Sequence, residues 1–293
     1  MERKSRIDTS GALILIVFMA VLGLNQVAVK IVNDGMAPLF QAGLRSVCAA
    51  PIILAYCLFK KRKIDLSRAI LLPGIATGCA FAFEFALLFQ AVQWTTVARA
   101  SVFFYTMPFW VAVGAHFLIP GEKLTRTRLL GLFLAAAGVV LALANVNTSA
   151  GELSWLGDIF ALLAATGWAA IALIARTTEF AKIKPDLQLL YQLVVSAIIL
   201  IPIALLSDET FRNPTNIHWL IFALQVVFVV CIGFMVWFWV LSVYPASDMA
   251  SFSFLAPLFG VIFGWLILDE PITAAIVVAL VFVATGIVLV NRR

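Results

Sequence analysis

Long apolar stretches alternate with short polar segments along the whole chain. A helix that crosses a bilayer core of about 30 Å needs roughly 20 apolar residues, and these stretches approach that length. Polar residues, glycine and proline mark the breaks, as at Asn33-Asp34-Gly35 and Asp269-Glu270-Pro271. The pattern predicts ten membrane-spanning helices, over residues 11–32, 37–59, 69–92, 95–118, 127–145, 154–176, 187–207, 217–243, 246–268 and 272–290.

The composition excludes a soluble protein. Hydrophobic residues make up 63% of the 293 residues and charged residues only 12%, and the mean hydropathy is +1.08. A soluble domain is about half apolar and about one-quarter charged. A chain of this length could not bury so much apolar surface in water, so lipid must surround most of it.

The basic residues predict the orientation of the chain in the membrane. The formal net charge is +5, but most of the Lys and Arg residues cluster in short loops, such as 60–63, that the ten-helix pattern places on one side. Positive loops remain on the cytoplasmic side. We therefore expect a multi-pass protein of a bacterial inner (plasma) membrane with both termini cytoplasmic, and no nucleic-acid partner.

Metal and cofactor chemistry has no sequence support. The four cysteines lie within apolar stretches without a Cys-x-x-Cys spacing, and the two histidines, His116 and His218, lie far apart. The cysteines are therefore expected to be buried free thiols. We expect no metal and no cofactor.

The chain also repeats itself. Glu122 and Glu270 each begin a Glu-x-x-Thr turn, and a glycine follows each glutamate after 16 residues, at Gly138 and Gly286. The two turns align with an offset of 148 residues. Several coincidences in one register indicate an internal duplication.

The duplication predicts two halves, residues 1–145 and 146–293, within one membrane domain. Each half holds five expected spans, so the second half must enter the membrane from the opposite face. Inverted repeats place a binding site near the middle of the bilayer and allow access to alternate between its two sides. The fold class that we expect is therefore an all-α polytopic membrane protein, with two inverted five-helix repeats.

These features resemble a known superfamily. Tandem five-helix copies, each beginning with an apolar span that ends in Lys30 or Arg176, are similar to the drug/metabolite transporter superfamily. The proline-initiated fourth helix, the Gly-Glu-x-x-Thr-like turn at 121–125 and the glycine-bearing fifth helix resemble its ten-helix EamA-type family, and within it the YddG-type aromatic amino-acid exporters. The resemblance covers residues 11–290. It implies a basket around a central cavity lined by helices 1, 3, 4, 6, 8 and 9, without covalent chemistry.

One acidic residue lies in the body of an expected span. Glu84 sits in the sequence Phe-Ala-Phe-Glu-Phe-Ala, and ionisable groups inside a bilayer usually face a cavity or a partner. Glu84 could hold a proton or the ammonium group of a substrate. Alternatively, it is a structural carboxylate paired with Arg45 or Arg99. Lys30 is expected to extend to the membrane surface rather than to contact substrate.

Other polar and aromatic residues within the expected spans complete a set that would suit an amphipathic zwitterion. Interhelical hydrogen bonds and lipid contacts are the alternative roles for these side chains. The substrate-binding candidates are Asn25, Gln26, Glu84, Tyr105, Trp168, Trp237 and Ser251, and the candidates for a proton or charge site are Glu84, Arg99 and Asp248.

Together these patterns favour a secondary transporter that exports small amphipathic solutes, above all aromatic or other large apolar amino acids, by alternating access. A carrier or facilitator for an organic cation, a drug or a nucleotide-sugar is the alternative. An integral-membrane enzyme would need a reactive Ser-His pair, paired aspartates or a metal cluster within the spans, so no catalytic residues are expected. The expected partners are a small-molecule substrate and the lipid bilayer, with no obligatory protein partner.

Overall fold

The computed structural model describes residues 8–120, 124–144, 151–207, 210–243, 252 and 255–291. Helices make up almost all of this part of the chain. They are α1 (Thr9–Gly35), α2 (Pro38–Phe59), α3 (Arg68–Trp94), α4 (Val97–Phe104), α5 (Met107–Leu118), α6 (Arg126–Ala144), α7 (Ser154–Thr177), α8 (Pro185–Leu206), α9 (Asn216–Leu224), α10 (Phe234–Val243), α12 (Leu255–Leu268) and α13 (Ala274–Asn291). A 3₁₀ turn, η2 (Glu179–Lys182), follows α7, and a π-helical segment, η3 (Gln225–Gly233), joins α9 to α10.

Local sequence signals explain where several helices begin. The Asp8 side chain accepts a hydrogen bond from Gly11 N at the start of α1, and Thr96 accepts one from Arg99 N at the start of α4. Such caps satisfy backbone donors that the first turn leaves unpaired. Pro38 and Pro185 open α2 and α8, where a missing N–H has no cost.

Seven helical segments are long and apolar enough to cross a membrane: Thr9–Gly35, Pro38–Phe59, Arg68–Trp94, Val97–Leu118, Ser154–Thr177, Pro185–Leu206 and Asn216–Trp237. Leu255–Leu268 and Ala274–Leu289 are shorter apolar helices. The chain is therefore an all-helical, multi-pass membrane protein. The count of ten spans stays a prediction, because the expected span 246–268 extends beyond the described residues.

Two expected spans are interrupted. The span expected at 95–118 divides into α4 and α5 at Tyr105 and Thr106. Pro108 lies at the start of α5, and a proline has no N–H to bond the carbonyl of Phe104, four residues earlier, so a continuous helix is disfavoured here. The span expected at 217–243 contains the π-helical segment η3 between α9 and α10.

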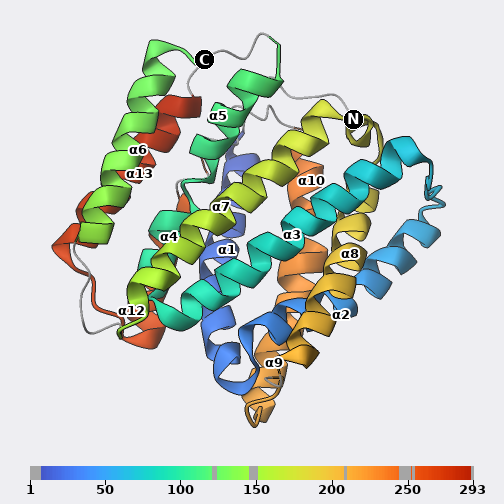
Figure 1. The fold of residues 1–293 in the computed structure, drawn as a ribbon, viewed down its shortest axis with the longest axis horizontal. Coiled ribbons are helices and arrows are strands. Elements are labelled where there is room, and N and C mark those ends of the chain that lie inside the picture. The colour runs from blue at the N-terminus through green and yellow to red at the C-terminus, as the bar shows by residue number, and fades with distance from the viewer. Residues whose placement is uncertain are drawn as a thin grey trace.

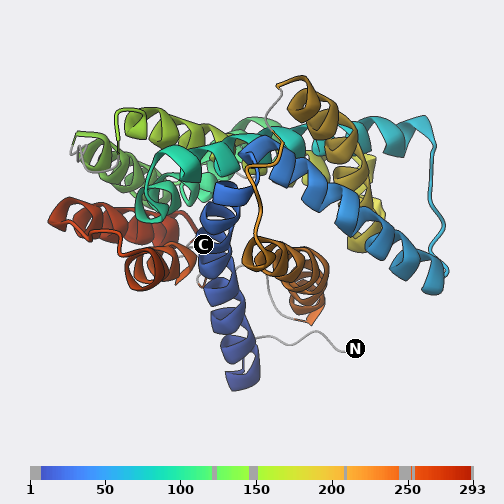
Figure 2. The ribbon, with the colours of Figure 1, turned by 90° about the horizontal axis from the view of Figure 1, so that it is seen from below.

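The helices before residue 145 interleave with those after residue 150. α3 packs on α7 and α8, α2 on α8, α6 on α13, and α12 on both α1 and α4. In Figure 2, α1 stands out from the layer that contains α2, α3, α7 and α8, and lies between α12 and the α9–α10 segment. α6 and α13 form one edge of the molecule in Figure 1.

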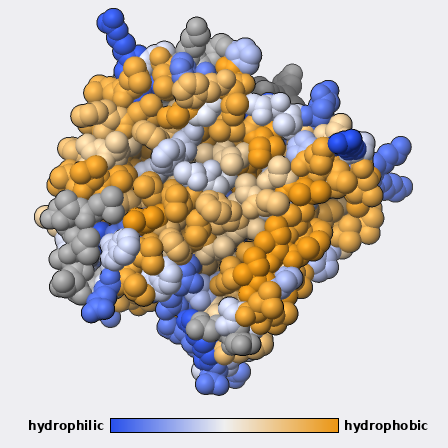
Figure 3. Space-filling model, viewed as in Figure 1, coloured by the Kyte–Doolittle hydropathy of each residue, from blue (hydrophilic) through white to orange (hydrophobic). Residues whose placement is uncertain are grey.

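Apolar side chains cover most of the surface in Figure 3, while hydrophilic residues lie mainly near its upper and lower margins. Leu206 and Phe59, for example, are 85% and 81% exposed. Contiguous apolar surface on this scale fits contact with lipid. The polar margins fit contact with water and lipid headgroups.

Candidate functional site

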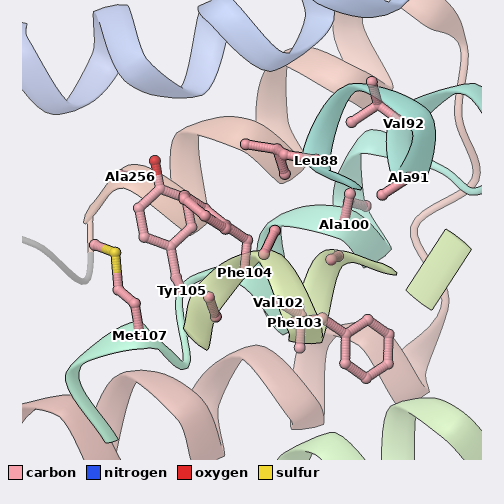
Figure 4. Packing of buried hydrophobic residues seen from close by; sticks show 14 of the residues in the cluster. Leu88, Ala91, Val92, Ala100, Val102, Phe103, Phe104, Tyr105, Met107 and Ala256 are labelled. Carbon is pink, nitrogen blue, oxygen red and sulfur yellow. The ribbon is translucent and has the colours of Figure 1, made fainter. Parts of the chain in front are cut away.

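A small polar cluster joins α1 to α4 inside the bundle. Ser101 Oγ donates a hydrogen bond of 2.9 Å to Gln26 Oε1. The Tyr105 hydroxyl lies within reach of the same Gln26 side chain. Tyr105 occupies the break between α4 and α5, next to Phe104, as Figure 4 shows. All three polar side chains are buried, so the predicted residues Gln26 and Tyr105 lie in one cluster.

Close helix contact holds this cluster together. A Cβ at Gly23 would lie 2.7 Å from Gly260 N, and a Cβ at Gly260 would lie 2.2 Å from Ser101 Oγ. Only glycine therefore allows α12 to approach α1 and α4 this closely, in the manner of small residues at membrane helix interfaces. The glycines position Ser101 against Gln26.

Glu84 of α3 lies beside this cluster and is 2% exposed. It interacts electrostatically with Arg45 of α2 and with the Tyr105 hydroxyl. Glu84 Oε2 is buried and accepts no hydrogen bond from any described residue. Between Glu84 and the end of α3 at Trp94 the helix rises by about 15 Å, which places the carboxylate well inside the bundle.

Arg45 was not among the residues predicted to bind substrate. It was expected only as an alternative structural partner of Glu84. Its guanidinium carbon lies 4.1 Å from the centre of the Phe85 ring and 4.7 Å from that of Phe89. The side chain is 2% exposed. Arg45 lies inside a long apolar stretch, and that position was the signal that could have identified it.

The two predicted tryptophans flank the same region. Trp168 directly follows Gly167, where a Cβ would lie 3.1 Å from the Glu84 Cβ, so α7 passes against Glu84 at this point. Trp237 of α10 stacks on Phe18 of α1, with ring centroids 5.3 Å apart. Both tryptophans are partly buried against the cluster that contains Tyr105.

The remaining candidates divide into two groups. Asn25 is half-buried, and its Oδ1 has no hydrogen-bond partner in the part of the chain that the structure describes. Asp248 and Ser251 lie outside the described residues. Their expected roles stay predictions.

Arg99 is held by an acid that the sequence analysis did not single out. Its Nε donates to Asp158 Oδ1 at 3.1 Å and to Oδ2 at 3.2 Å, and its terminal nitrogen donates to Oδ2 as well. Thr95 Oγ1 donates to Asp158 Oδ1 at 2.9 Å. This buried ion pair fastens α4 to α7.

Lys30 does not simply extend to the membrane surface. Its Nζ lies 2.7 Å from Glu270 Oε1 and donates to Thr95 O at 2.9 Å. Glu270 also accepts hydrogen bonds from the backbone N–H groups of Val97 and Ala98, at 3.0 and 3.3 Å. A carboxylate at this position complements the positive end of the α4 dipole. The repeat alignment identified Glu270, but not its partner.

Lys30, Thr95, Asp158 and Glu270 lie at one end of the bundle, which we call the Thr95 end. The other end carries more exposed contacts. Arg62 Nε donates to Asp186 Oδ2 at 2.8 Å, and this hydrogen bond raises the pKa of the Arg62 guanidinium. Among the described residues, the Thr95 end holds the fully buried Arg99–Asp158 pair, whereas Arg62 and Asp186 are partly exposed.

The central cluster lies apart from two hollows in the molecule. One, of about 370 Å³, is lined by Gln93, Trp94 and residues 151–153. The second, of about 200 Å³, lies between Cys48 and the α9–η3 segment around Trp219. Neither is lined by the predicted site residues. Among the described residues, no group of three or more His, Cys, Asp or Glu side chains could hold a metal ion.

Comparison with known proteins agrees with this architecture. Residues 9–144 and residues 155–292 each match the EamA-like transporter family. A probable amino-acid metabolite efflux pump of Escherichia coli is 30% identical, over 97% of this chain and 94% of its own length. An uncharacterized transporter of Bacillus subtilis is 25% identical, over 90% of this chain and 91% of its own. The crystal structure of another protein has the same fold, with a TM-score of 0.67 at 17% identity, over 96% of this chain and 97% of that one.

Proposed function

This chain belongs to the EamA-like transporter family, and from that premise we propose that it is a secondary transporter that exports amino acids, above all aromatic and other large apolar ones, by alternating access. A buried group of polar and charged side chains next to aromatic walls carries the proposal. Gln26, Glu84 and Tyr105 supply the polar part, and Trp168 and Trp237 supply the walls. An amphipathic amino acid needs both kinds of contact.

The arrangement of the helices supports alternating access. Helices from the two halves of the chain pair with each other throughout the bundle. A movement of one half against the other would therefore change both ends of the bundle at once. In this proposal the protein lies in a bacterial inner membrane with both termini cytoplasmic, so the Thr95 end faces the outside.

The charged residues have different roles in this proposal. Glu84 is the charge site, because one of its oxygens is buried without a partner among the described residues. Arg99 contributes by fixing α4 against Asp158 and leaves the substrate to other groups. Asn25, Ser251 and Asp248 remain candidates for further contacts.

Relatives support the substrate class. A second probable amino-acid metabolite efflux pump, from Salmonella typhimurium, is 29% identical over 97% of this chain. An anionic nucleotide-sugar is a weaker fit, since it would meet a buried glutamate. An organic cation remains the best competing substrate, because a lone carboxylate would suffice to bind it.

Counterflow in proteoliposomes tests the proposal. The purified full-length chain, loaded with unlabelled phenylalanine, should accumulate labelled phenylalanine and tryptophan faster than protein-free liposomes do. A panel of organic cations, nucleotide-sugars and small polar amino acids serves as the comparison. If cations or nucleotide-sugars exchange while no amino acid does, the proposed substrate class is wrong.

A further inference from the structure

Arg45 is a buried cation without a direct polar partner. Its guanidinium packs over the Phe85 and Phe89 rings, and no hydrogen bond or ion pair joins it to another described residue. Cation–π contact compensates a buried charge only in part. A guanidinium that lies over aromatic faces still has its N–H edge available, and that edge fits a carboxylate with two parallel hydrogen bonds.

Glu84 is a buried acid that, like Arg45, has no direct ionic partner among the described residues. It is buried, its Oε2 has no partner within the described ranges, and it interacts with Arg45 electrostatically without forming a direct ion pair. Elsewhere the structure joins buried acids directly to cations, as in Arg99–Asp158 and Lys30–Glu270. Arg45 contacts Phe85, the residue that follows Glu84 in α3, so two groups of opposite charge lie close together without a direct hydrogen bond among the described residues.

Taking two charges out of water without direct contact leaves a large desolvation cost uncompensated. In the part of the chain that the structure describes, this cost arises beside the polar cluster of Gln26, Ser101 and Tyr105. A ligand that carried both a carboxylate and an ammonium group would satisfy both side chains at once. A ligand with only one charge would bind one of these two side chains and leave the other buried without a direct polar partner.

We propose that Arg45 and Glu84 form a clamp for zwitterions, in which Arg45 binds the carboxylate of an α-amino acid and Glu84 binds its ammonium group. This inference rests on the proposed function and narrows it, because it defines the substrate by its backbone charges rather than by its side chain. Phe85, which contacts the Arg45 guanidinium, lies next to Glu84 in α3. An aromatic substrate side chain would find apolar contacts beside the clamp.

Analogues with one charge test the clamp in the unaltered protein. Phenylethylamine lacks the carboxylate, and phenylpropionate lacks the ammonium group, but both keep the ring. In counterflow of labelled phenylalanine, each analogue should compete about tenfold to a hundredfold less well than unlabelled phenylalanine, since each loses one charge-assisted interaction. Equal competition by either analogue would overturn the clamp while leaving amino-acid transport intact.

Single substitutions should change the specificity. With Arg45→Gln, the Glu84 carboxyl remains as the partner for an ammonium group, so phenylethylamine should gain on phenylalanine as a competitor. With Glu84→Gln, Arg45 keeps its charge, so phenylpropionate should gain instead. Arg45→Lys should restore transport only in part, because a lysine cannot form the paired hydrogen bonds of a guanidinium. Unchanged preferences in both single variants would contradict the assignment.

The double variant Arg45→Gln/Glu84→Gln separates the clamp from a structural role. If the two charges only balance each other, removing both should give a folded protein that exchanges phenylalanine at the unaltered rate, and the clamp would be wrong. If they form the clamp, the double variant should fold and lose phenylalanine exchange by about tenfold or more.

Lys182→Gln, in an exposed pair, is the matched control and should exchange normally. If the unaltered protein exchanges no amino acid at all, the proposed function fails and the clamp with it.

Discussion

Two buried arginine–acid pairs lie in this bundle, and they differ in how completely they are bonded. Arg99 and Asp158 share several hydrogen bonds and receive a further one from Thr95. Arg45 and Glu84 interact electrostatically, but no direct hydrogen bond joins them. Both pairs join different helices, and all four side chains are almost fully buried. Burial alone therefore does not determine how a charge is used.

The difference follows from what each pair must do. The bonded pair fixes α4 against α7, and its hydrogen-bonding groups are already paired. An open pair stabilises the fold less, and it keeps donors and acceptors for another molecule. Functional sites commonly retain such locally unfavourable groups, and the rest of the fold compensates for them. We therefore assign the proposed substrate binding to Arg45 and Glu84 rather than to Arg99 and Asp158.

Breaking the bonded pair should have the largest effect on stability. Arg99→Ala leaves Asp158 buried without its cation, so the protein should lose about 3–5 kcal/mol of stability. Arg45→Ala removes no hydrogen bond and should cost less. Thermal unfolding in detergent, followed for both variants beside the unaltered protein, checks the order. An equal or larger loss for Arg45→Ala would show that the two pairs are not as different as their contacts indicate.

Much of the fold could be predicted because lipid imposes simple rules. Length and hydropathy identified the apolar helices, and the repeated turns led to the family resemblance, which the two family matches confirm. The break at Tyr105 and the π-helical segment at 225–233 were not predicted. Hydropathy does not report such interruptions, because they depend on local backbone hydrogen bonding and, at Tyr105, on Pro108.

The site could be predicted only in part, for a different reason. Glu84 was recognisable as an acid within an apolar stretch, and Gln26 and Tyr105 as polar interruptions. Whether Arg45 or Arg99 lies near Glu84 could be decided only from the tertiary structure, because partners on different helices have no fixed spacing in sequence. Asp158 lies only one turn into α7, so its position alone did not distinguish it from a polar residue at a membrane boundary.

The Lys30–Glu270 pair should have an intermediate effect. Glu270→Gln keeps an acceptor for the Val97 N–H but removes the charge that attracts Lys30 and the start of α4. Charged hydrogen bonds contribute about 1.5–3 kcal/mol each, and Lys30 is 28% exposed, so we expect a loss near the lower end of that range. A double-mutant cycle with Lys30→Met measures the coupling between the two residues. Additive losses would mean that Glu270 acts through the α4 backbone alone.

The exposed pair Lys182–Glu179 should have the smallest effect. Its side chains are 73% and 54% exposed, and water screens exposed pairs so well that they contribute less than about 1 kcal/mol. Lys182→Gln should therefore leave the unfolding temperature in detergent and the rate of phenylalanine exchange unchanged, although the two residues are in direct contact. A marked loss of stability would mean that direct pairing contributes more to stability than burial does. The expected order of stability losses, from Arg99 through Glu270 to Lys182, would then be wrong. A marked loss of exchange alone would place η2 in the transport cycle.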